Sequence, residues 1–180
     1  MTKCTLFETQ TKDMIDWKQS LVNATTYKYQ PENYLRGLSR GVEFEFEHKI
    51  SSVLTQGLNY TYLEARGKRE DEADYKTLKF RPRHQANYKI QYNNDSGFGV
   101  MLAGQYVHRQ WEQDGEQGMK LPSYTILNMR ISQQILDAEL FLGVDNITDK
   151  KYIDRTDGFG KTFPLPGRTI FGGITVKFWG

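Results

Sequence analysis

The chain has 180 residues, enough for one domain. Its formal net charge is only +2, so the composition shows no excess of basic residues that would favour nucleic acid as a partner. The single cysteine, Cys4, excludes an internal disulfide and a thiolate metal cluster. No run of about 18 apolar residues is present, which excludes a transmembrane helix but leaves open a transmembrane β-barrel, whose strands are only half apolar.

Short segments of alternating polarity predict strands along most of the chain. The clearest alternation is Val42-Glu43-Phe44-Glu45-Phe46-Glu47, where the apolar side chains share one face and the glutamates share the other. Such a strand separates an apolar medium from water. In chain order, strands are expected over residues 3–16, 42–47, 54–65, 83–92, 98–109, 124–135, 138–147 and 169–178.

The connections between these strands are of two kinds. Polar or charge-rich segments without an apolar period predict long loops over residues 18–33, 66–79, 111–121 and 148–167. Short turns are expected over residues 50–53, 93–97 and 136–137. Long and short connections alternate along the chain. This alternation is typical of outer-membrane barrels, which place short turns on the periplasmic side and long loops on the extracellular side.

The fold class that follows is all-β, an antiparallel transmembrane β-barrel of about eight strands. One face of each strand should meet lipid, and the other should meet a wet lumen. The residues expected to face lipid are Val42, Phe44, Phe46, Leu140, Leu142, Val144, Ile174, Val176 and Phe178. No signal peptide precedes the first expected strand, so an outer-membrane protein would contain this chain as one piece of a longer sequence.

Several stretches, taken in order, resemble the carboxyl-terminal part of the barrel of TonB-dependent outer-membrane receptors, and the resemblance covers nearly all of the chain. The matching stretches are Asp13-Met14-Ile15-Asp16-Trp17, Gly41-Val42-Glu43-Phe44-Glu45, Asn59-Tyr60-Thr61-Tyr62-Leu63-Glu64-Ala65-Arg66, Arg81-Pro82-Arg83-His84, Val144-Asp145-Asn146-Ile147-Thr148-Asp149-Lys150-Lys151-Tyr152 and Pro166-Gly167-Arg168. The family usually has Leu-Phe where Ile147-Thr148 stands, and Trp179-Gly180 extend past Phe178.

The resemblance implies that residues 1–180 form the carboxyl-terminal portion of a barrel, part of a larger one in the bacterial outer membrane. The expected function is uptake of a scarce nutrient, most of all a ferric siderophore, with cobalamin or haem as other small-molecule ligands. Outer-membrane lipid and the missing barrel strands would be partners. The plug domain is absent, and TonB would be reached only through the absent amino-terminal region.

The family-motif residues have a structural role in this interpretation. They are Asn146, Asp149, Tyr152, Pro166, Gly167 and Arg168. Side chains that cap their own backbone suit a position where a strand ends and a loop begins. Pro166-Gly167 can then start the return strand, and Arg168 can pair with carboxylates at the rim.

Residues for catalysis or cofactor binding are not evident. His48, His84 and His108 lie on three expected strands without metal-ligand spacing, and no nucleophile elbow or phosphate-binding glycine loop is present. We therefore expect no enzyme activity, no catalytic residues, no cofactor and no metal. Two alternatives stay open: a stand-alone small outer-membrane barrel with a structural or adhesive role, and a soluble ligand-binding barrel whose apolar face points inward.

Overall fold

The computed structural model describes residues 1–23, 26–69, 72–157 and 161–176, and within these ranges it consists of strands and their connections, with no helix. The strands are β1 Thr2–Asn23, β2 Thr26–Lys49, β3 Leu54–Lys68, β4 Lys76–Thr77, β5 His84–Asn93, β6 Phe98–His108, β7 Gln110–Gln113, β8 Gln117–Leu121, β9 Tyr124–Ile135, β10 Ala138–Asp145, β11 Ile153–Thr156, β12 Thr162–Pro164 and β13 Thr169–Val176.

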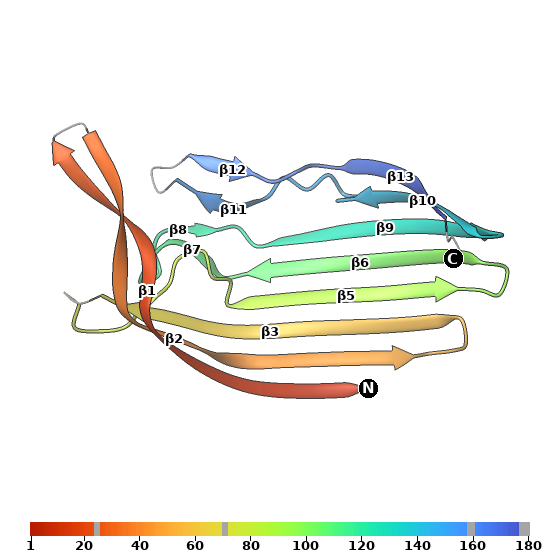
Figure 1. Cartoon of the computed structure of the whole chain (residues 1–180), viewed down its shortest axis with the longest axis horizontal. Coiled ribbons are helices and arrows are strands. Elements are labelled where there is room, and N and C mark those ends of the chain that lie inside the picture. Colours follow the sequence, from red (N-terminus) through yellow and green to blue (C-terminus); the bar gives the residue numbers. More distant parts are fainter. Residues whose placement is uncertain (24–25, 70–71, 158–160, 177–180) are drawn as a thin grey trace.

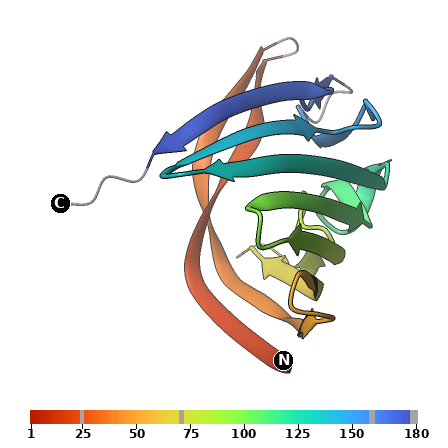
Figure 2. The same cartoon turned by 90° about the vertical axis from the view of Figure 1, so that its right-hand side faces the viewer.

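The main sheet follows the chain, with neighbours in the order β1-β2-β3-β5-β6-β9-β10-β13 and the short β4 paired to β3. Every pair is antiparallel. The all-β antiparallel fold and the strand number expected from sequence are therefore confirmed. The sheet curves into an open trough rather than a closed ring, with β1 and β13 at its two edges (Figures 1 and 2).

Short turns and long connections lie at opposite ends of the strands, as expected (Figure 1). The turn between β5 and β6 shows the local cause: the Asn94 side-chain oxygen accepts hydrogen bonds from the backbone amides of Ser96 at 3.1 Å and Phe98 at 3.0 Å. Gly97 has a φ of +79°. A side chain there would also meet Gln134 Cβ at 2.6 Å, so the turn requires glycine.

The expected loop over residues 18–33 is wrong. β1 and β2 instead continue as a two-stranded ribbon, with Trp17 opposite Pro31 and Gln19 opposite Tyr29. The ribbon rises beyond the end of the main sheet (Figure 1). The sequence over these residues has no sustained period-two alternation of polarity, so it gave no strand signal.

Two other expected loops contain small hairpins. β7 pairs with β8 inside residues 111–121, and β11 pairs with β12 inside residues 148–167. The fully buried apolar residues among those described gather near this end of the molecule, and they are Ala65, Val107, Leu121 and Ile126. A single curved sheet buries little else, because no second layer covers either face.

Candidate functional site

The strand register divides the main sheet into two chemically different faces. Phe44 lies opposite Tyr60, Leu142 lies opposite Ile131, and Leu140 lies opposite Ile174. Of the nine residues expected to face lipid, the eight within the described ranges all fall on this apolar face, and Phe178 lies outside those ranges. Leu142 is 56% exposed and Ile174 66% exposed. The register provides the geometry that lipid contact requires, and the contact itself stays a prediction.

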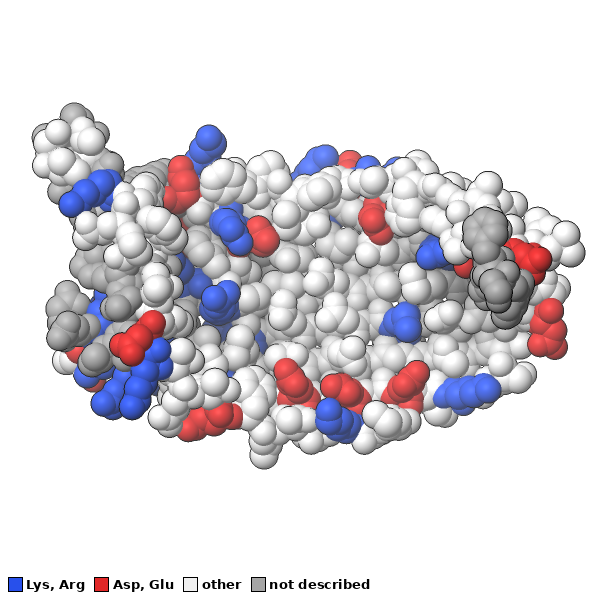
Figure 3. Space-filling model, in the orientation of Figure 1, with Lys and Arg blue, Asp and Glu red and all other residues white. Residues whose placement is uncertain are grey.

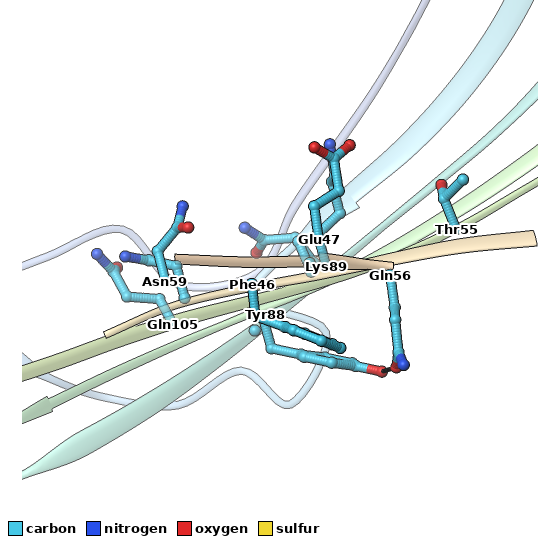
Figure 4. A pocket seen from close by; sticks show the side chains of 13 residues that line it. Phe46, Glu47, Thr55, Gln56, Asn59, Tyr88, Lys89 and Gln105 are labelled. Carbon is cyan, nitrogen blue, oxygen red and sulfur yellow. Dashed lines mark hydrogen bonds between the residues drawn. The ribbon is translucent and has the colours of Figure 1, made fainter. Parts of the chain in front are cut away.

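The second face is polar and lines the inside of the trough. Charged side chains are visible over the middle of the strands in Figure 3, and the close view separates the faces, with Glu47 and Lys89 on one side and Phe46 and Tyr88 on the other (Figure 4). A depression of about 570 Å³ is lined here by Asn59, Asn87, Gln105 and Asn128 in addition to Glu47 and Lys89. Such a wall suits water or a polar protein segment.

Glutamates on this inner face have basic neighbours rather than the environment of an acid catalyst. Lys3 Nζ lies 3.9 Å from Glu45 Oε1, and an Arg130 guanidinium nitrogen lies 3.1 Å from Glu139 Oε1. Arg130 also stacks over the Phe141 ring, 4.1 Å from its centroid. These contacts fit the interpretation of the glutamates as lumen-lining groups.

The long connections at the other end of the strands bind one another through ion pairs. Arg69, just past β3, lies 3.3 Å from Asp114 in the β7–β8 turn, and the other oxygen of Asp114 accepts from the Lys79 backbone amide at 2.8 Å. Glu116 pairs with Arg83 at 2.7 Å and with Arg109 at 3.4 Å. The connection from β3 to β5 is therefore fixed to the β7–β8 hairpin.

Glu72 is part of the same loop network. Burial by itself would raise the pKa of Glu72. Two hydrogen bonds outweigh this effect and lower the pKa, one from Lys76 Nζ at 2.8 Å and one from the Arg69 backbone amide at 3.1 Å. The carboxylate therefore stays charged and holds the loop at neutral pH.

A buried polar contact adds the third long connection to this group. Glu112 and Thr156 are 7% and 5% exposed, and the Thr156 hydroxyl donates to Glu112 Oε1 at 2.6 Å. The Met119 amide donates to Glu112 Oε2 at 3.1 Å, and Gln110 Nε2 donates to the Asp154 carbonyl at 2.6 Å. We call residues 69, 72–83, 109–123, 146–157 and 161–168 the loop cap, because these contacts hold its segments together.

A cavity of about 260 Å³ opens where the β1–β2 ribbon approaches the loop cap. Its lining combines Met14 and Ile15 from the ribbon with loop-cap residues Leu78, Lys79, Phe80, Arg81, Asp114 and Arg155. Apolar and cationic side chains therefore converge from four segments that are distant in sequence. We call this space the mouth cavity, and it could not be predicted from sequence because no local spacing connects its parts.

Asn146 closes the end of β10. It is 2% exposed, has a φ of +51°, and its side-chain amide donates to the carbonyls of Lys150 at 2.9 Å and Pro166 at 3.3 Å. Its side-chain oxygen accepts from the Lys150 amide at 2.8 Å. The residue thus satisfies backbone groups on both sides of the long connection, and asparagine tolerates the left-handed conformation that this position needs.

Asp149 joins this motif to the return strand. The backbone amide of Arg168, rather than its guanidinium, donates to Asp149 Oδ1 at 2.9 Å. This bond, helped by Lys151, lowers the pKa of Asp149. A side chain at Gly167 would lie 2.7 Å from the same oxygen, which explains the glycine. Tyr152 lies against Tyr124, with 4.7 Å between ring centroids.

Two of the three histidines are neighbours, which their separation in sequence does not show. His84 on β5 is paired with His108 on β6, with ring centroids 5.8 Å apart. The Tyr60 hydroxyl lies 2.8 Å from His84 Nδ1, and Ser123 Oγ lies 2.5 Å from His108 Nδ1. These rings lie on the apolar face close to Tyr62 and Tyr106, at the strand ends where barrels carry an aromatic girdle.

The described residues contain no group of three or more His, Cys, Asp or Glu side chains that could hold a metal ion. Over the same part of the chain, no helix has the length and apolar character needed to cross a membrane.

Comparisons with known proteins agree with this architecture. The chain is 30% identical over 123 residues to the ferrioxamine receptor of Yersinia enterocolitica, a match that covers 64% of this chain and 17% of that protein. It is 28% identical over 150 residues to the ferrioxamine B receptor of Salmonella typhimurium, covering 78% of this chain and 21% of the relative. The chain thus spans about a fifth of the length of these relatives.

Solved structures show the same fold at low sequence identity. The copper transporter OprC superposes with a TM-score of 0.80 at 18% identity, over 98% of this chain and 29% of that one. The ferric yersiniabactin uptake receptor FyuA from Yersinia pestis superposes with a TM-score of 0.74 at 20% identity, and the match covers 99% of this chain and 27% of the FyuA chain. The model of the TonB dependent receptor-like β-barrel matches residues 2–147. Strand order, the two-faced register and this match together show that the chain belongs to the TonB-dependent receptor β-barrel family, whose members reside in the outer membrane of Gram-negative bacteria.

Proposed function

We propose that the chain is the carboxyl-terminal portion of the barrel of an outer-membrane receptor that takes up a ferric siderophore. The observation that carries this proposal is the combination of a two-faced sheet with a loop cap and a mouth cavity at the end of its polar face. Ferrioxamine receptors among the relatives support an iron chelate as the ligand.

In this proposal residues 1–180 form one continuous part of the wall, and the plug and the remaining strands come from elsewhere in the receptor. The open edges of β1 and β13 support a larger barrel over the stand-alone small barrel, because unpaired backbone groups cannot be left bare in lipid. TonB would act through the plug region rather than through this wall. Outer-membrane lipid would cover the apolar face. This sheet carries binding and passage, not catalysis.

The mouth cavity is the part of this chain that we assign to the ligand. Phe80 offers an aromatic surface, while Arg81 and Arg155 are exposed and can donate hydrogen bonds to the oxygen atoms of an iron chelate. The contacts within the loop cap hold the backbone segments that carry these side chains, so ligand binding would not have to order the loops.

The test is uptake of radioactive iron by iron-starved cells that lack other receptors and produce the protein. Ferrioxamine B, a ferric catecholate, haem and cobalamin are offered separately. We expect TonB-dependent uptake of at least one ferric siderophore, with a several-fold loss in an Arg81→Ala/Arg155→Ala variant. A Lys49→Ala variant, altered at the short-turn end, is the matched control. Equal uptake by cells with and without the protein, for all four ligands, would rule the proposal out.

A further inference from the structure

Strand register brings His84 and His108 together at the ends of β5 and β6 that lie beside the β7–β8 hairpin (Figure 1). The two residues are directly opposite each other, and their ring centroids are 5.8 Å apart with an angle of 39° between the ring planes. Both residues are half-buried, so part of each remains accessible from outside the protein. We call these two residues the histidine pair.

The backbone that carries the histidine pair is held on both sides. Beyond the pair, the Arg83 amide donates to the Arg109 carbonyl at 3.1 Å, and toward β3 the Leu63 amide donates to the Arg83 carbonyl at 2.9 Å. The two rings therefore cannot move far apart unless the sheet opens. A ligand that contacts both rings would find them already in place, which lowers the entropy cost of binding.

Each ring of the pair has one nitrogen next to a hydroxyl group. The Tyr60 hydroxyl lies 2.8 Å from His84 Nδ1, and Ser123 Oγ lies 2.5 Å from His108 Nδ1. A hydroxyl oxygen can accept a hydrogen bond, so each Nδ1 can carry the proton and donate it, and the lone pair of the neutral ring is then on Nε2. Histidines that bind metal ions through one nitrogen are held through the other nitrogen in this way.

The two hydroxyl partners lie on opposite flanks of the pair. Tyr60 belongs to β3, on the side of β5 that is away from His108, and Ser123 directly precedes β9, on the side of β6 that is away from His84. The two nitrogens of an imidazole are on different edges of the ring. Because each Nδ1 faces its own outer flank, the Nε2 edges face the space between β5 and β6.

The separation of the rings fits one ion bound to both Nε2 atoms. An ion about 2.0–2.1 Å from each nitrogen lies roughly 3.2 Å from each ring centroid. Two rings at a tetrahedral angle would then have centroids about 5.2 Å apart, and two rings in line with the ion would have them about 6.4 Å apart. The observed 5.8 Å lies between these two values.

The charged residues beside the pair in sequence have a partner of their own. Arg83 and Arg109 both bind Glu116 of the β7–β8 turn, at 2.7 Å and 3.4 Å, so their positive charge is partly compensated. Across the described part of the chain, no third His, Cys, Asp or Glu joins the pair in a metal-binding group. An ion at the pair would therefore have two imidazole ligands and would fill its other positions with water.

We propose that His84 and His108 together bind one divalent transition-metal ion. Imidazole nitrogen suits Cu²⁺, Ni²⁺ and Zn²⁺, and Cu²⁺ has the highest affinity of the three for a site of this kind. Mg²⁺ and Ca²⁺ prefer oxygen ligands and do not fit. An ion held here joins the ends of β5 and β6 next to the loop cap, where Arg83 and Arg109 already bind Glu116.

The experiment measures Cu²⁺ binding to the receptor purified in detergent, by calorimetry and by electron paramagnetic resonance. Every protein in the series carries Cys4→Ser, because Cys4 is an exposed free thiol that would itself bind copper. The test variants are His84→Gln and His108→Gln. The matched control is His48→Gln, which removes a histidine from the same outward face at the short-turn end of β2. Copper sites elsewhere in the receptor are common to all variants and cancel in the differences.

We expect one equivalent of Cu²⁺ to bind at least roughly tenfold more weakly to each test variant, with less than about a twofold change in the control. The resonance spectrum of this equivalent should show coupling to two imidazole nitrogens in the unaltered site and to one in each test variant. Excess Mg²⁺ should leave both results unchanged, because Mg²⁺ has no preference for imidazole.

Three results would overturn the proposal. One is unchanged Cu²⁺ binding in both test variants, and another is a spectrum that shows no coupling to two nitrogens in the unaltered site. The third is displacement of the ion by excess Mg²⁺, which would make the binding unspecific. If the test variants lose their β-sheet circular dichroism, Tyr60→Phe repeats the comparison, because it keeps both rings and removes only the hydroxyl beside His84 Nδ1. A several-fold loss is expected, and no loss would count against the proposal.

Discussion

Replacing Phe44 by arginine tests the assignment of the two faces. Phe44 lies on the apolar face between Cys4 and Tyr60, four residues from Arg40 in one direction and from His48 in the other. Four residues correspond to about 13 Å of strand, or about 10 Å along the membrane normal at a tilt of about 40°. Phe44 therefore lies inside an apolar band about 25 Å tall, two residues from the aromatic level of Tyr62, and an arginine between the interface and the middle of the band costs about 1–3 kcal/mol.

The matched control is the same substitution one residue further along, at Glu45, which faces inward. Its ion pair with Lys3 is 3.9 Å long and exposed, so its loss should cost less than about 1 kcal/mol. Reversible urea unfolding of the receptor in lipid vesicles gives both free energies of unfolding. We expect Phe44→Arg to reduce the folding equilibrium constant by roughly 5- to 150-fold and Glu45→Arg by less than about fivefold. Equal losses at the two positions would refute the assignment of the apolar face to lipid.

Further predictions follow from the loops, the capping motif and the sheet edges. In intact cells, a membrane-impermeant thiol reagent should label a cysteine placed at Gln117 in the loop cap but not one placed at Ser96, and labelling of Ser96→Cys from outside would invert the orientation. Asn146→Ala should lower the free energy of unfolding by about 1–3 kcal/mol, because the carbonyls of Lys150 and Pro166 lose their donor and the Lys150 amide loses its acceptor, with Asn94→Ala expected to cost less. The pKa of Asp149 is lower in the folded state than in the unfolded state. Its contribution to the free energy of unfolding is therefore complete above the unfolded-state pKa and is lost as the pH falls through the folded-state pKa. Asp149→Asn should remove that part of the acid dependence when unfolding is measured as a function of pH, and an unchanged profile would contradict the assignment. The 180-residue chain refolded alone in detergent should associate through the edges of β1 and β13, and a monodisperse, heat-modifiable monomer by size exclusion and gel mobility would show that the edges close.

The sequence was sufficient for properties that depend on near neighbours in the chain. Side chains alternate across a strand with period two, so the pattern at residues 42–47 already separated Phe44 from Glu45, whatever the strand pairs with. Asparagine and glycine chemistry likewise located the turn at residues 93–97. Capping by Asn146 could also be anticipated, because an asparagine side chain that forms hydrogen bonds with the backbone a few residues later is a local feature.

The ribbon over residues 18–23 and 26–33 escaped sequence reasoning, because its residues show no polarity alternation that would indicate a strand. Properties that depend on which strands are neighbours were fixed only by the tertiary structure. The pairing of His84 with His108 and the buried contact of Glu112 with Thr156 each join residues far apart in the chain. Register decides these contacts, because a shift of one residue would move each side chain to the opposite face of the sheet.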